Sequence, residues 1–332
     1  MAKRSRKKGK KGIIILVLIA ILAASFIGLF IRPVPVHQEV FFRIPEQATT
    51  SDIAQMLESE GLIRHHLPFK LYTRLTGLDG KLKAGEYSFT GQVSLWDIGE
   101  KISRGQAQTK KVTIPEGYNL IQIAQLLAEN GFVDQDKFLE VAQTKNFPYP
   151  YLPPPNSPER LEGFLFPDTY QITPGWPEDK VIAMMLKRFD DVFLSEWHDR
   201  AREIGMTIHE IVTLASIIEK EAKVPEDRPV IASVFYNRIK SGMHLESCAT
   251  VQYALGEVKQ VLLYEDLKID SPYNTYLHGG LPPGPIACPG KASLEAALYP
   301  ADSNFYYFVA KSDGSHYFSR TLAEHNEGKR KY

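Results

Sequence analysis

The chain opens with a basic tail followed by a long uncharged run. Its first eleven residues contain seven lysines and arginines and no acid, and residues 12–31 then carry no charge. At a rise of about 1.5 Å per residue, a helix of this length spans roughly 30 Å, the thickness of a bilayer core. A cleavable signal peptide would have an apolar region of about 7–15 residues, although Ala23–Ser25 offers a weak cleavage-like site. The sequence therefore predicts an uncleaved, single-pass transmembrane anchor over 12–32.

The charge distribution predicts which side of the membrane holds the folded body. Basic residues stay in the cytoplasm, so we expect a cytoplasmic tail at 1–11 and an extracytoplasmic body at the plasma (inner) membrane. Without the seven tail residues the chain has 32 basic and 39 acidic residues, a net charge of about −7. A nucleic-acid partner would favour a basic face, so this charge argues against one. A topology signal explains the tail more simply than nucleic acid or anionic lipid does.

A strand, a turn and a helix occur twice in the sequence. Ile44-Pro45-Glu46, Ile53-Ala54-Gln55-Met56-Leu57 and Gly61 recur seventy residues later as Ile114-Pro115-Glu116, Ile123-Ala124-Gln125-Leu126-Leu127 and Gly131. The first copy predicts a strand at 40–44 and a helix that has Thr50 or Ser51 as its N-cap. With a further strand at 84–89 and a helix at 94–102, we expect a strand-helix-helix-strand module over 38–107. Its element order loosely resembles LysM-type glycan-binding modules, and a spacer domain is the alternative.

The rest of the chain, 108–332, predicts a mixed domain. A proline-rich loop precedes helical patterns at 177–204, 207–223 and 229–241. Residues 306–310 and 316–318 lie on either side of an Asp-Gly turn and predict a β-hairpin. Helices and antiparallel strands without strict alternation are typical of the α+β class. The predicted fold is therefore α+β, with one N-terminal transmembrane helix, the small LysM-like module and this domain.

The helix predicted over 207–222 ends in two acids. Apolar residues at 211, 214, 215, 218 and 222 form one stripe. Glu219 and Glu221 lie about 200° apart, on opposite flanks of that stripe, with Lys220 on the outer face. A carboxyl at the edge of an apolar stripe is partly desolvated, which raises its pKa and suits it to general acid catalysis. Solvated charges at a helix end are the alternative, and helical geometry does not choose between the two acids.

Four segments carry residue combinations that are unlike scaffold sequence. They are Glu162–Tyr170, the Glu219-Lys220-Glu221 helix end, Gly242–Tyr253, and Ser271–Gly290 with its Tyr-Asn-Thr-Tyr and Gly-Leu-Pro-Pro-Gly runs. In this order they resemble the YceG/MltG family of endolytic murein transglycosylases, over nearly the whole chain. The resemblance implies a peptidoglycan lytic transglycosylase that needs no metal or cofactor. It would cleave the MurNAc-GlcNAc bond of nascent glycan strands, form 1,6-anhydro-MurNAc ends, terminate strand elongation and act beside peptidoglycan synthases.

The resemblance also assigns roles to the acids. The family's catalytic glutamate corresponds to Glu221, which would protonate the glycosidic oxygen and then accept the proton of the sugar's own C6 hydroxyl. One acid is therefore enough, provided that its pKa lies above the free value. Glu219 would be a supporting acid, and a salt bridge with Arg228 is the alternative. Glu162 and Asp168 are further candidate site residues.

Three residues of the Tyr-Asn-Thr-Tyr run are predicted to bind the glycan. Tyr273 and Tyr276 offer stacking surfaces, and Asn274 offers amide donors for acetamido sugars. A turn-stabilising role after a proline is the alternative for Asn274.

The two cysteines lie in the part of the chain that we expect to be exported. Cys248 stands where many family members have Asp, since Glu246-Ser247-Cys248-Ala249-Thr250-Val251 replaces a Gln-Thr-Asp-Pro-Thr-Val run. An oxidising compartment allows a pair to form a disulfide, so we expect a Cys248–Cys288 bridge to hold this loop, with free thiols as the alternative. No short ligand pair in the sequence predicts a zinc site.

Two other functions remain open from the sequence. A hydrolytic muramidase on the same scaffold would need a second carboxylate to activate water, with Asp168 or Glu162 as candidates. A non-catalytic glycan-binding scaffold that recruits synthases would need no acid. The two acids at the helix end argue against the scaffold.

Overall fold

The computed structural model describes residues 17, 28, 32–106, 108–259 and 261–332, and the chain divides into two compact units. The first unit comprises Met1–Lys110 with Ile172–Pro177, and the second comprises Lys111–Gln171 with Glu178–Tyr332. The predicted anchor over 12–32 lies outside the described residues, apart from positions 17, 28 and 32. Among the described residues, no helix combines the length and the apolarity that crossing a membrane requires.

The described residues of the first unit form a two-stranded antiparallel sheet and three helices. Its elements are β1 (Val34–Ile44), α2 (Thr50–Ser59), α3 (His66–Thr76), β2 (Gly85–Val93) and α4 (Leu95–Arg104). Ile44 pairs with Gly85 and Phe42 with Tyr87, and the register shifts between Val36 and Val40. The described order is therefore strand-helix-helix-strand-helix. The helix predicted at 94–102 is α4, which follows the second strand, and α3 was not predicted; the likeness to LysM modules stays a prediction.

Local sequence signals set the helices of this unit. Thr49, not Thr50 or Ser51, caps α2, because its side chain accepts from the Asp52 amide while Asp52 reaches back to Thr49. Ser94 and Asp97 form the same capping box at α4. The apolar faces of the helices then meet the sheet in one core that includes Phe42, Ile44, Ile53, Leu57, Phe69, Tyr87, Ile98 and Ile102.

The second unit holds most of the helices and two further two-stranded sheets, β3–β4 and β5–β6. From Lys110 to the C-terminus the elements are β3 (Lys110–Thr113), α5 (Leu120–Glu129), α6 (Gln135–Thr144), β4 (Thr169–Ile172), α7 (Glu178–Val192), α8 (Ser195–Glu203), α9 (Ile208–Glu221), η1 (Pro225–Asp227), α10 (Arg228–Lys240), α11 (Cys248–Leu255), η2 (Asp266–Lys268), α12 (Lys291–Leu298), β5 (Tyr307–Ala310), β6 (His316–Ser319) and α13 (Leu322–Lys331). Helices beside small sheets confirm the α+β class. The hairpin β5–β6 forms as predicted, with Ala310 opposite His316.

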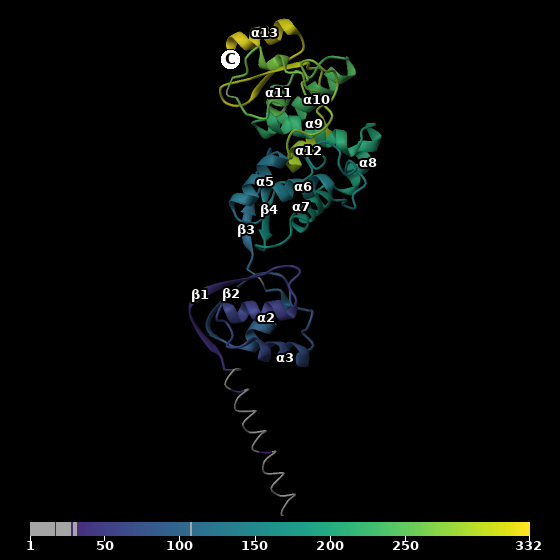
Figure 1. The fold of residues 1–332 in the computed structure, drawn as a ribbon. Helices are drawn as coiled ribbons and strands as arrows, with labels where there is room; N and C mark the ends of the chain where they lie inside the picture. Colours follow the sequence, from purple (N-terminus) through teal and green to yellow (C-terminus); the bar gives the residue numbers. More distant parts are fainter. Residues whose placement is uncertain (1–16, 18–27, 29–31, 107, 260) are drawn as a thin grey trace, which may run out of the picture. The chain divides into compact units, whose positions relative to one another are not determined.

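Helix α9 is the central element of the second unit. Every residue from Ile211 to Ile218 is buried, and α8, α10, α11 and α12 all pack against it, as Figure 1 shows. A helix that is covered on all sides cannot shift or rotate without disturbing its neighbours. The carboxyl end of α9 is therefore a rigid position for a functional side chain.

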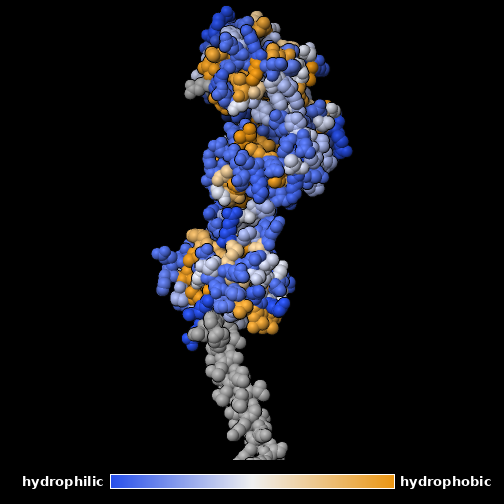
Figure 2. All heavy atoms as spheres, in the orientation of Figure 1, coloured by the Kyte–Doolittle hydropathy of each residue, from blue (hydrophilic) through white to orange (hydrophobic). Residues whose placement is uncertain are grey.

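Two helical predictions for this unit need correction. The pattern over 177–204 forms two helices, α7 and α8, with a break at Phe193 and Leu194. The stretch between the pattern over 229–241 and the hairpin, for which no helix was predicted, contains the short helices α11 and α12. On the face of the molecule in Figure 2, hydrophobic residues form small patches among hydrophilic ones, because most large apolar side chains lie inside the units.

Candidate active site at the carboxyl end of helix α9

The two acids at the end of α9 have different surroundings. The helix begins at a capping box formed by Thr207 and Glu210, and its last helical residue is Glu221. Ala222 is extended, and the short 3-10 helix η1 follows at Pro225. Glu219 and Glu221 lie on opposite flanks of the helix end, and each contacts its own set of residues. Those partners distinguish the two acids, which the sequence alone did not.

Glu221 has the environment of a proton donor. The Ser247 hydroxyl donates to Glu221 Oε1 at 2.5 Å, and the residue as a whole keeps partial contact with solvent. Burial raises the pKa of the Glu221 carboxyl, and the Ser247 hydrogen bond, the charge of His316 and the Ala249 amide oppose part of that rise. Burial favours the neutral carboxyl, which can donate a proton, and the Ser247 hydroxyl stabilises the carboxylate that remains. The same side chain can therefore donate a proton and later accept one.

Glu219 instead belongs to a closed polar network. Its Oε2 accepts from the Ser293 hydroxyl at 2.7 Å and from the Gly290 amide at 3.1 Å. Its Oε1 lies 3.6 Å from Arg228 Nη2, so the salt bridge weighed from the sequence is present. Gly290 caps α12, and the Glu219 carboxylate therefore lies at the positive end of that helix. These contacts tie α9 to α12.

A second acid from the repeated sequence lies beside this network. Burial, followed by the charge of Glu219, raises the pKa of the Glu116 carboxyl, while Arg228 lowers it. A Cβ added at Gly290 would meet Glu116 Oε1 at 1.9 Å, so a larger residue there would displace this carboxyl. Glu116 belongs to the second copy of the sequence repeat, but the repeat did not predict its position near the end of α9.

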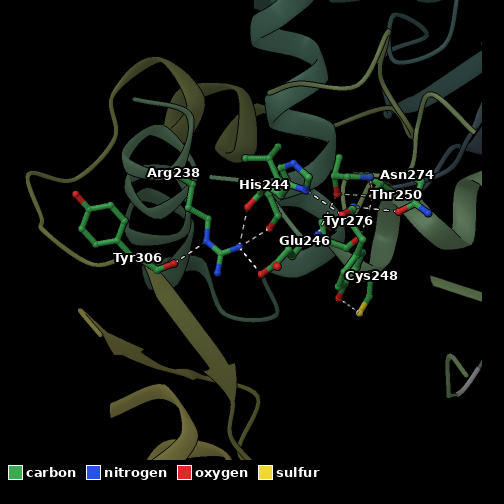
Figure 3. Close-up of polar contacts among 11 residues, drawn as sticks. Arg238, His244, Glu246, Cys248, Thr250, Asn274, Tyr276 and Tyr306 are labelled. Atoms are coloured by element: carbon green, nitrogen blue, oxygen red, sulfur yellow. Dashed lines mark hydrogen bonds and ion pairs between the residues drawn. The ribbon is translucent and has the colours of Figure 1, made fainter. Parts of the chain in front are cut away.

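The segment that carries Ser247 is fixed by Arg238 of α10, whose side chain is only 8% exposed. Arg238 Nε donates to the Tyr306 carbonyl at 2.7 Å, and its Nη1 donates to the His244 carbonyl at 2.9 Å. Nη1 also lies 3.0 Å from Glu246 Oε2. Figure 3 shows the guanidinium pointing into this turn. A buried guanidinium with several acceptors is a strong clamp, because losing any acceptor leaves a charge poorly solvated.

The backbone conformation at Glu246 also fixes the position of Ser247. Glu246 has a φ of 52°, the left-handed region that a residue with a side chain seldom occupies. Its amide donates to the Thr275 carbonyl at 3.1 Å, and the Ser247 amide donates to Thr275 Oγ1 at 3.1 Å. Strained backbone that the surrounding structure maintains is typical of functional sites. Here the strain lies directly before the residue that contacts Glu221.

Of the predicted glycan contacts, Asn274 has a different role. It is fully buried, and its Nδ2 donates to the carbonyls of Leu267 and Ile269, each at 2.9 Å. Its Oδ1 accepts from the Tyr276 amide at 3.0 Å. Since these bonds use both amide protons, the prediction that Asn274 contacts a sugar is corrected. The turn-stabilising alternative describes it.

Tyr276 lies close to Glu221. Burial raises the pKa of the Tyr276 phenol strongly, and Cys248 and the charge of Glu221 add to the rise. Its carbonyl accepts from His244 Nδ1 at 2.9 Å, which orients the segment (Figure 3). Tyr273, three residues earlier, is 8% exposed, and its hydroxyl donates to Glu159 Oε2 at 3.1 Å. The structure therefore places one tyrosine beside the acid and the other beside Glu159.

The predicted disulfide is absent, because both cysteines are free. Cys248 is exposed at the start of α11, and its Sγ lies 3.2 Å from Tyr276 Oη. Cys288 is buried, and burial raises the pKa of its thiol, so it favours the neutral form. Its backbone is held instead by two hydrogen bonds, to the Tyr118 carbonyl at 2.7 Å and from the Gly117 amide at 2.9 Å. The turn before α11 is held by the hydrogen bonds of the Glu246 and Ser247 amides to Thr275, not by a bridge.

Glu162 and Asp168 have their own partners away from Glu221. Glu162 is 3% exposed; its Oε1 accepts from the Leu120 amide at 3.0 Å and its Oε2 from the Tyr253 hydroxyl at 3.2 Å. Burial raises the pKa of Glu162 to about 7. Burial acts to raise the pKa of Asp168, but the Thr169 amide and Arg188 outweigh it, so the pKa lies below its usual value. Arg188 Nε lies 2.6 Å from Asp168 Oδ2.

A buried aspartate–histidine pair is the site feature that the sequence analysis missed. Both the amide and Nδ1 of His316 contact Asp227 Oδ2, at 2.7 Å and 2.8 Å. Asp227 follows α9 by six residues, whereas His316 lies on β6. The charge of His316 lowers the pKa of Glu221, so the pair lies within electrostatic reach of the acid. The signal available in the sequence was a lone histidine in a predicted hairpin.

Within the described residues, one group has the side chains to hold a metal ion. Glu58, His65 and His66 bring possible ligand atoms within 4.8 Å of one another in the first unit. Glu58 Oε2 already lies 2.5 Å from His66 Nδ1 as an ion pair. The two imidazole rings are stacked with their centroids 4.5 Å apart. His65 Nδ1 accepts from the Leu67 amide at 3.2 Å, so two of the ring nitrogens in this group already have protein partners.

An acid at a rigid helix end, with a hydroxyl donor on its carboxyl and Tyr276 nearby, defines a candidate glycan-cleaving site. The sequence model of the YceG-like family matches residues 42–331. The chain belongs to the YceG-like family.

Relatives of known name agree with this assignment. The chain is 37% identical over 307 residues to the endolytic murein transglycosylase of Bacillus subtilis (strain 168), covering 88% of this chain and 84% of that protein. It is 34% identical to the Streptococcus pneumoniae (strain D39) protein of the same name, covering 85% of this chain and 56% of the longer pneumococcal one. A crystal structure of a putative YceG-like protein from Listeria monocytogenes has a TM-score of 0.61 at 36% identity, over 87% of this chain and 98% of that one.

Proposed function

We propose that this chain is an endolytic murein transglycosylase in which Glu221 is the general acid and then the general base. The observation that carries the proposal is the carboxyl of Glu221, whose pKa is raised by burial and whose Oε1 accepts from Ser247. The names of the relatives supply the substrate class, the murein glycan strand. A single acid with this environment is sufficient for an intramolecular transfer, which needs no activated water.

The reaction follows from the two protonation states of Glu221. The neutral carboxyl donates its proton to the glycosidic oxygen between MurNAc and GlcNAc as the bond from that oxygen to MurNAc C1 breaks. The C6 hydroxyl of the same MurNAc attacks C1, and its proton passes to the Glu221 carboxylate. A 1,6-anhydro ring forms on one product, a hydroxyl forms on the other, and no water is consumed. The Ser247 hydroxyl stabilises the carboxylate between the two steps.

The surroundings of the other acids favour this assignment over the hydrolytic alternative. A muramidase would need a second carboxylate that can activate water beside the scissile bond. Asp168 is paired with Arg188, and Glu162 is enclosed by Leu120 and Tyr253. Neither is in contact with Glu221 or Ser247 among the hydrogen bonds of the described chain.

We also propose the cellular placement that the sequence indicates. The basic tail and the uncharged run over 12–31 favour a single-pass anchor with an extracytoplasmic catalytic unit. The unit before Lys110 would be a LysM-like glycan-binding module, and nascent strands near the membrane would be the substrate. Peptidoglycan synthases, which make these strands, would be the neighbouring enzymes. Protease digestion of intact spheroplasts tests the topology, since only an exported body would be degraded.

The function is tested by the mass of the new chain ends. The full-length protein is incubated with uncrosslinked glycan strands in water enriched in oxygen-18, and the products are analysed by mass spectrometry. We expect ends in 1,6-anhydro-MurNAc without the heavy isotope, because no water enters the product. Reducing ends that carry the heavy isotope would show a hydrolase. Binding of strands without cleavage would support the scaffold alternative.

A further inference from the structure

Helix α3 of the first unit has apolar side chains on its outer face. Its inner face packs into the core of the unit through Phe69 and Thr73, which are fully buried. Three leucines on the other side, Leu67, Leu71 and Leu75, are 57%, 50% and 77% exposed. Residues four apart lie on the same face of a helix, so these leucines form one stripe, and a hydrophobic patch lies over α3 in Figure 2. Because the outer face of a helix is usually polar, this stripe indicates a binding surface.

Two basic side chains lie along the same stripe. Lys70 and Arg74 each follow a stripe leucine by three residues, so both lie on the leucine side of the helix, which has no acidic residue. Lys70 Nζ donates to Ser51 Oγ at 3.1 Å. The ion pairs among the described residues of the first unit involve other side chains. The positive charges of Lys70 and Arg74 are therefore available to an anionic partner. We call the three leucines and these two basic residues the α3 face.

A cavity of about 500 Å³ joins the basic and apolar groups of the α3 face. Its wall includes Ser51, Leu67, Lys70, Leu71, Arg74 and Asp79. Two cations and a hydroxyl can contact the oxygens of a phosphate diester, and the leucines beside them can contact hydrocarbon. Asp79 is the one acid among the described residues of the wall, so two positive charges face one negative charge. A molecule that carries both a phosphate and hydrocarbon, as a phospholipid does, fits these groups.

The first unit follows the proposed anchor directly. The uncharged run ends at Ile31, and β1 begins at Val34. Three residues of extended chain span at most roughly 10 Å, and a unit of about 75 residues has a radius of gyration of roughly 11 Å. Every face of the first unit can therefore reach the lipid headgroups of an anchored chain. The face that combines leucines with basic residues would bind an anionic lipid surface most strongly.

We propose that the α3 face docks on the anionic phospholipids of the membrane that holds the anchor. The inference goes beyond the proposed reaction and rests on the proposed placement of the chain. The leucines enter the boundary between headgroups and acyl chains, and Lys70 and Arg74 contact the phosphate groups. Docking holds the first unit against the lipid, whereas the short connection between the run and β1 would by itself let the unit rotate.

The test uses the full-length protein with photo-reactive benzoylphenylalanine in place of Leu71. The protein is mixed with detergent-treated vesicles of phosphatidylglycerol or of phosphatidylcholine, and the vesicles are recovered by flotation and irradiated. Mass spectrometry then measures the lipid adducts at position 71. We expect adducts with phosphatidylglycerol and at least about fivefold fewer with phosphatidylcholine, because one basic side chain near an anionic surface favours docking about fivefold. The same probe in place of Glu140, an exposed residue of α6, measures chance contact with lipid.

Two pairs of substitutions separate the charges from the stripe. Lys70→Gln with Arg74→Gln removes both charges, and Leu67→Ser with Leu75→Ser removes two exposed leucines. Each pair should lower the adducts with phosphatidylglycerol at least about fivefold, and leave the cleavage of free strands in detergent unchanged. Adducts that are absent, equal in the two lipids, no more frequent than at position 140, or unaffected by both pairs would overturn the docking surface. Adducts to a protein in place of lipid, in irradiated native membranes, would overturn it as well and indicate a partner protein.

Failure of the other proposals has separate readouts in the same experiment. A chain that floats only with phosphatidylglycerol vesicles would contradict the anchor and support the α3 face, whereas a chain that floats with neither lipid would overturn both. A wild type that forms the lipid adducts and does not cleave glycan strands would contradict the proposed function and leave the docking surface supported.

Discussion

Removing the Ser247 hydroxyl should change the pH dependence of catalysis in a defined direction. Ser247 Oγ donates to Glu221 Oε1 at 2.5 Å, and a hydrogen bond to a charged group contributes about 1.5–3 kcal/mol. Glu221 keeps partial contact with solvent, so we take the lower end of that range. Because 1.36 kcal/mol corresponds to one pH unit, Ser247→Ala should move the titration that controls activity by about one unit.

The sign follows from the form of Glu221 that the hydroxyl stabilises. Ser247 lowers the pKa of Glu221 by favouring the carboxylate. Without it the neutral acid persists to higher pH. Since kcat/KM reports the free enzyme, which must carry the protonated acid, the alkaline limb of the kcat/KM profile should move upward in pH. The assay is the release of anhydro ends from uncrosslinked strands across a pH series.

A matched control is available at the neighbouring acid. Ser293→Ala removes a hydroxyl that donates to Glu219 Oε2 at 2.7 Å. It should reduce stability and leave the alkaline limb in place, because Glu219 does not exchange the proton in this account. An unchanged limb in Ser247→Ala, or an equal shift in both variants, would refute the reasoning.

Other predictions follow from the same contacts. His316→Gln removes a charge that lowers the pKa of Glu221, so the alkaline limb should again move to higher pH while the melting temperature reports any loss of packing. Burial raises the pKa of Glu162 from 4.5 to about 7, so the wild type should lose unfolding free energy, about 3 kcal/mol, as the pH rises between these values; urea titrations should show a smaller loss for Glu162→Gln. Asn274→Ala leaves two buried carbonyls without their donor, and it should cost about 1–3 kcal/mol in the same assay. Since Cys248 and Cys288 are free, a reducing agent should change neither the activity nor the melting temperature. A drop in either would indicate a disulfide bridge.

Elements with a strong local signal were predictable from the sequence. The stripe over 211–222 predicted α9 and its acidic end, and the Asp-Gly turn predicted the β5–β6 hairpin. The repeat predicted the strand and helix that begin each unit. These features depend on periodicity and turn chemistry within a few residues, which a single sequence carries.

Features that depend on long-range contacts were not predictable. Helix α11 is short and only Thr250 and Val251 are buried in it, so its pattern has no distinct apolar stripe. The Asp227–His316 pair joins residues 89 apart in the chain. The expected bridge is absent because the fold places Cys248 at an exposed position beside Tyr276 and buries Cys288, and the number of cysteines in a sequence does not predict such positions.

The identity of the acid also depended on long-range contacts. Helical geometry placed Glu219 and Glu221 at the two edges of one apolar stripe, so it could not distinguish their roles. Ser293 and Arg228, from other elements, engage the first acid, and Ser247 engages the second. The choice between them is therefore made by tertiary packing around the helix end.

The most direct test of the account is the comparison of Glu221→Gln with Glu219→Gln in the full-length chain. Both remove one carboxylate and keep the side-chain shape. We expect Glu221→Gln to abolish the release of 1,6-anhydro-MurNAc ends while its melting temperature stays close to that of the wild type. Glu219→Gln should lower the melting temperature and retain measurable activity with the same products. Loss of activity confined to Glu219→Gln, or full activity of Glu221→Gln, would contradict the central claim.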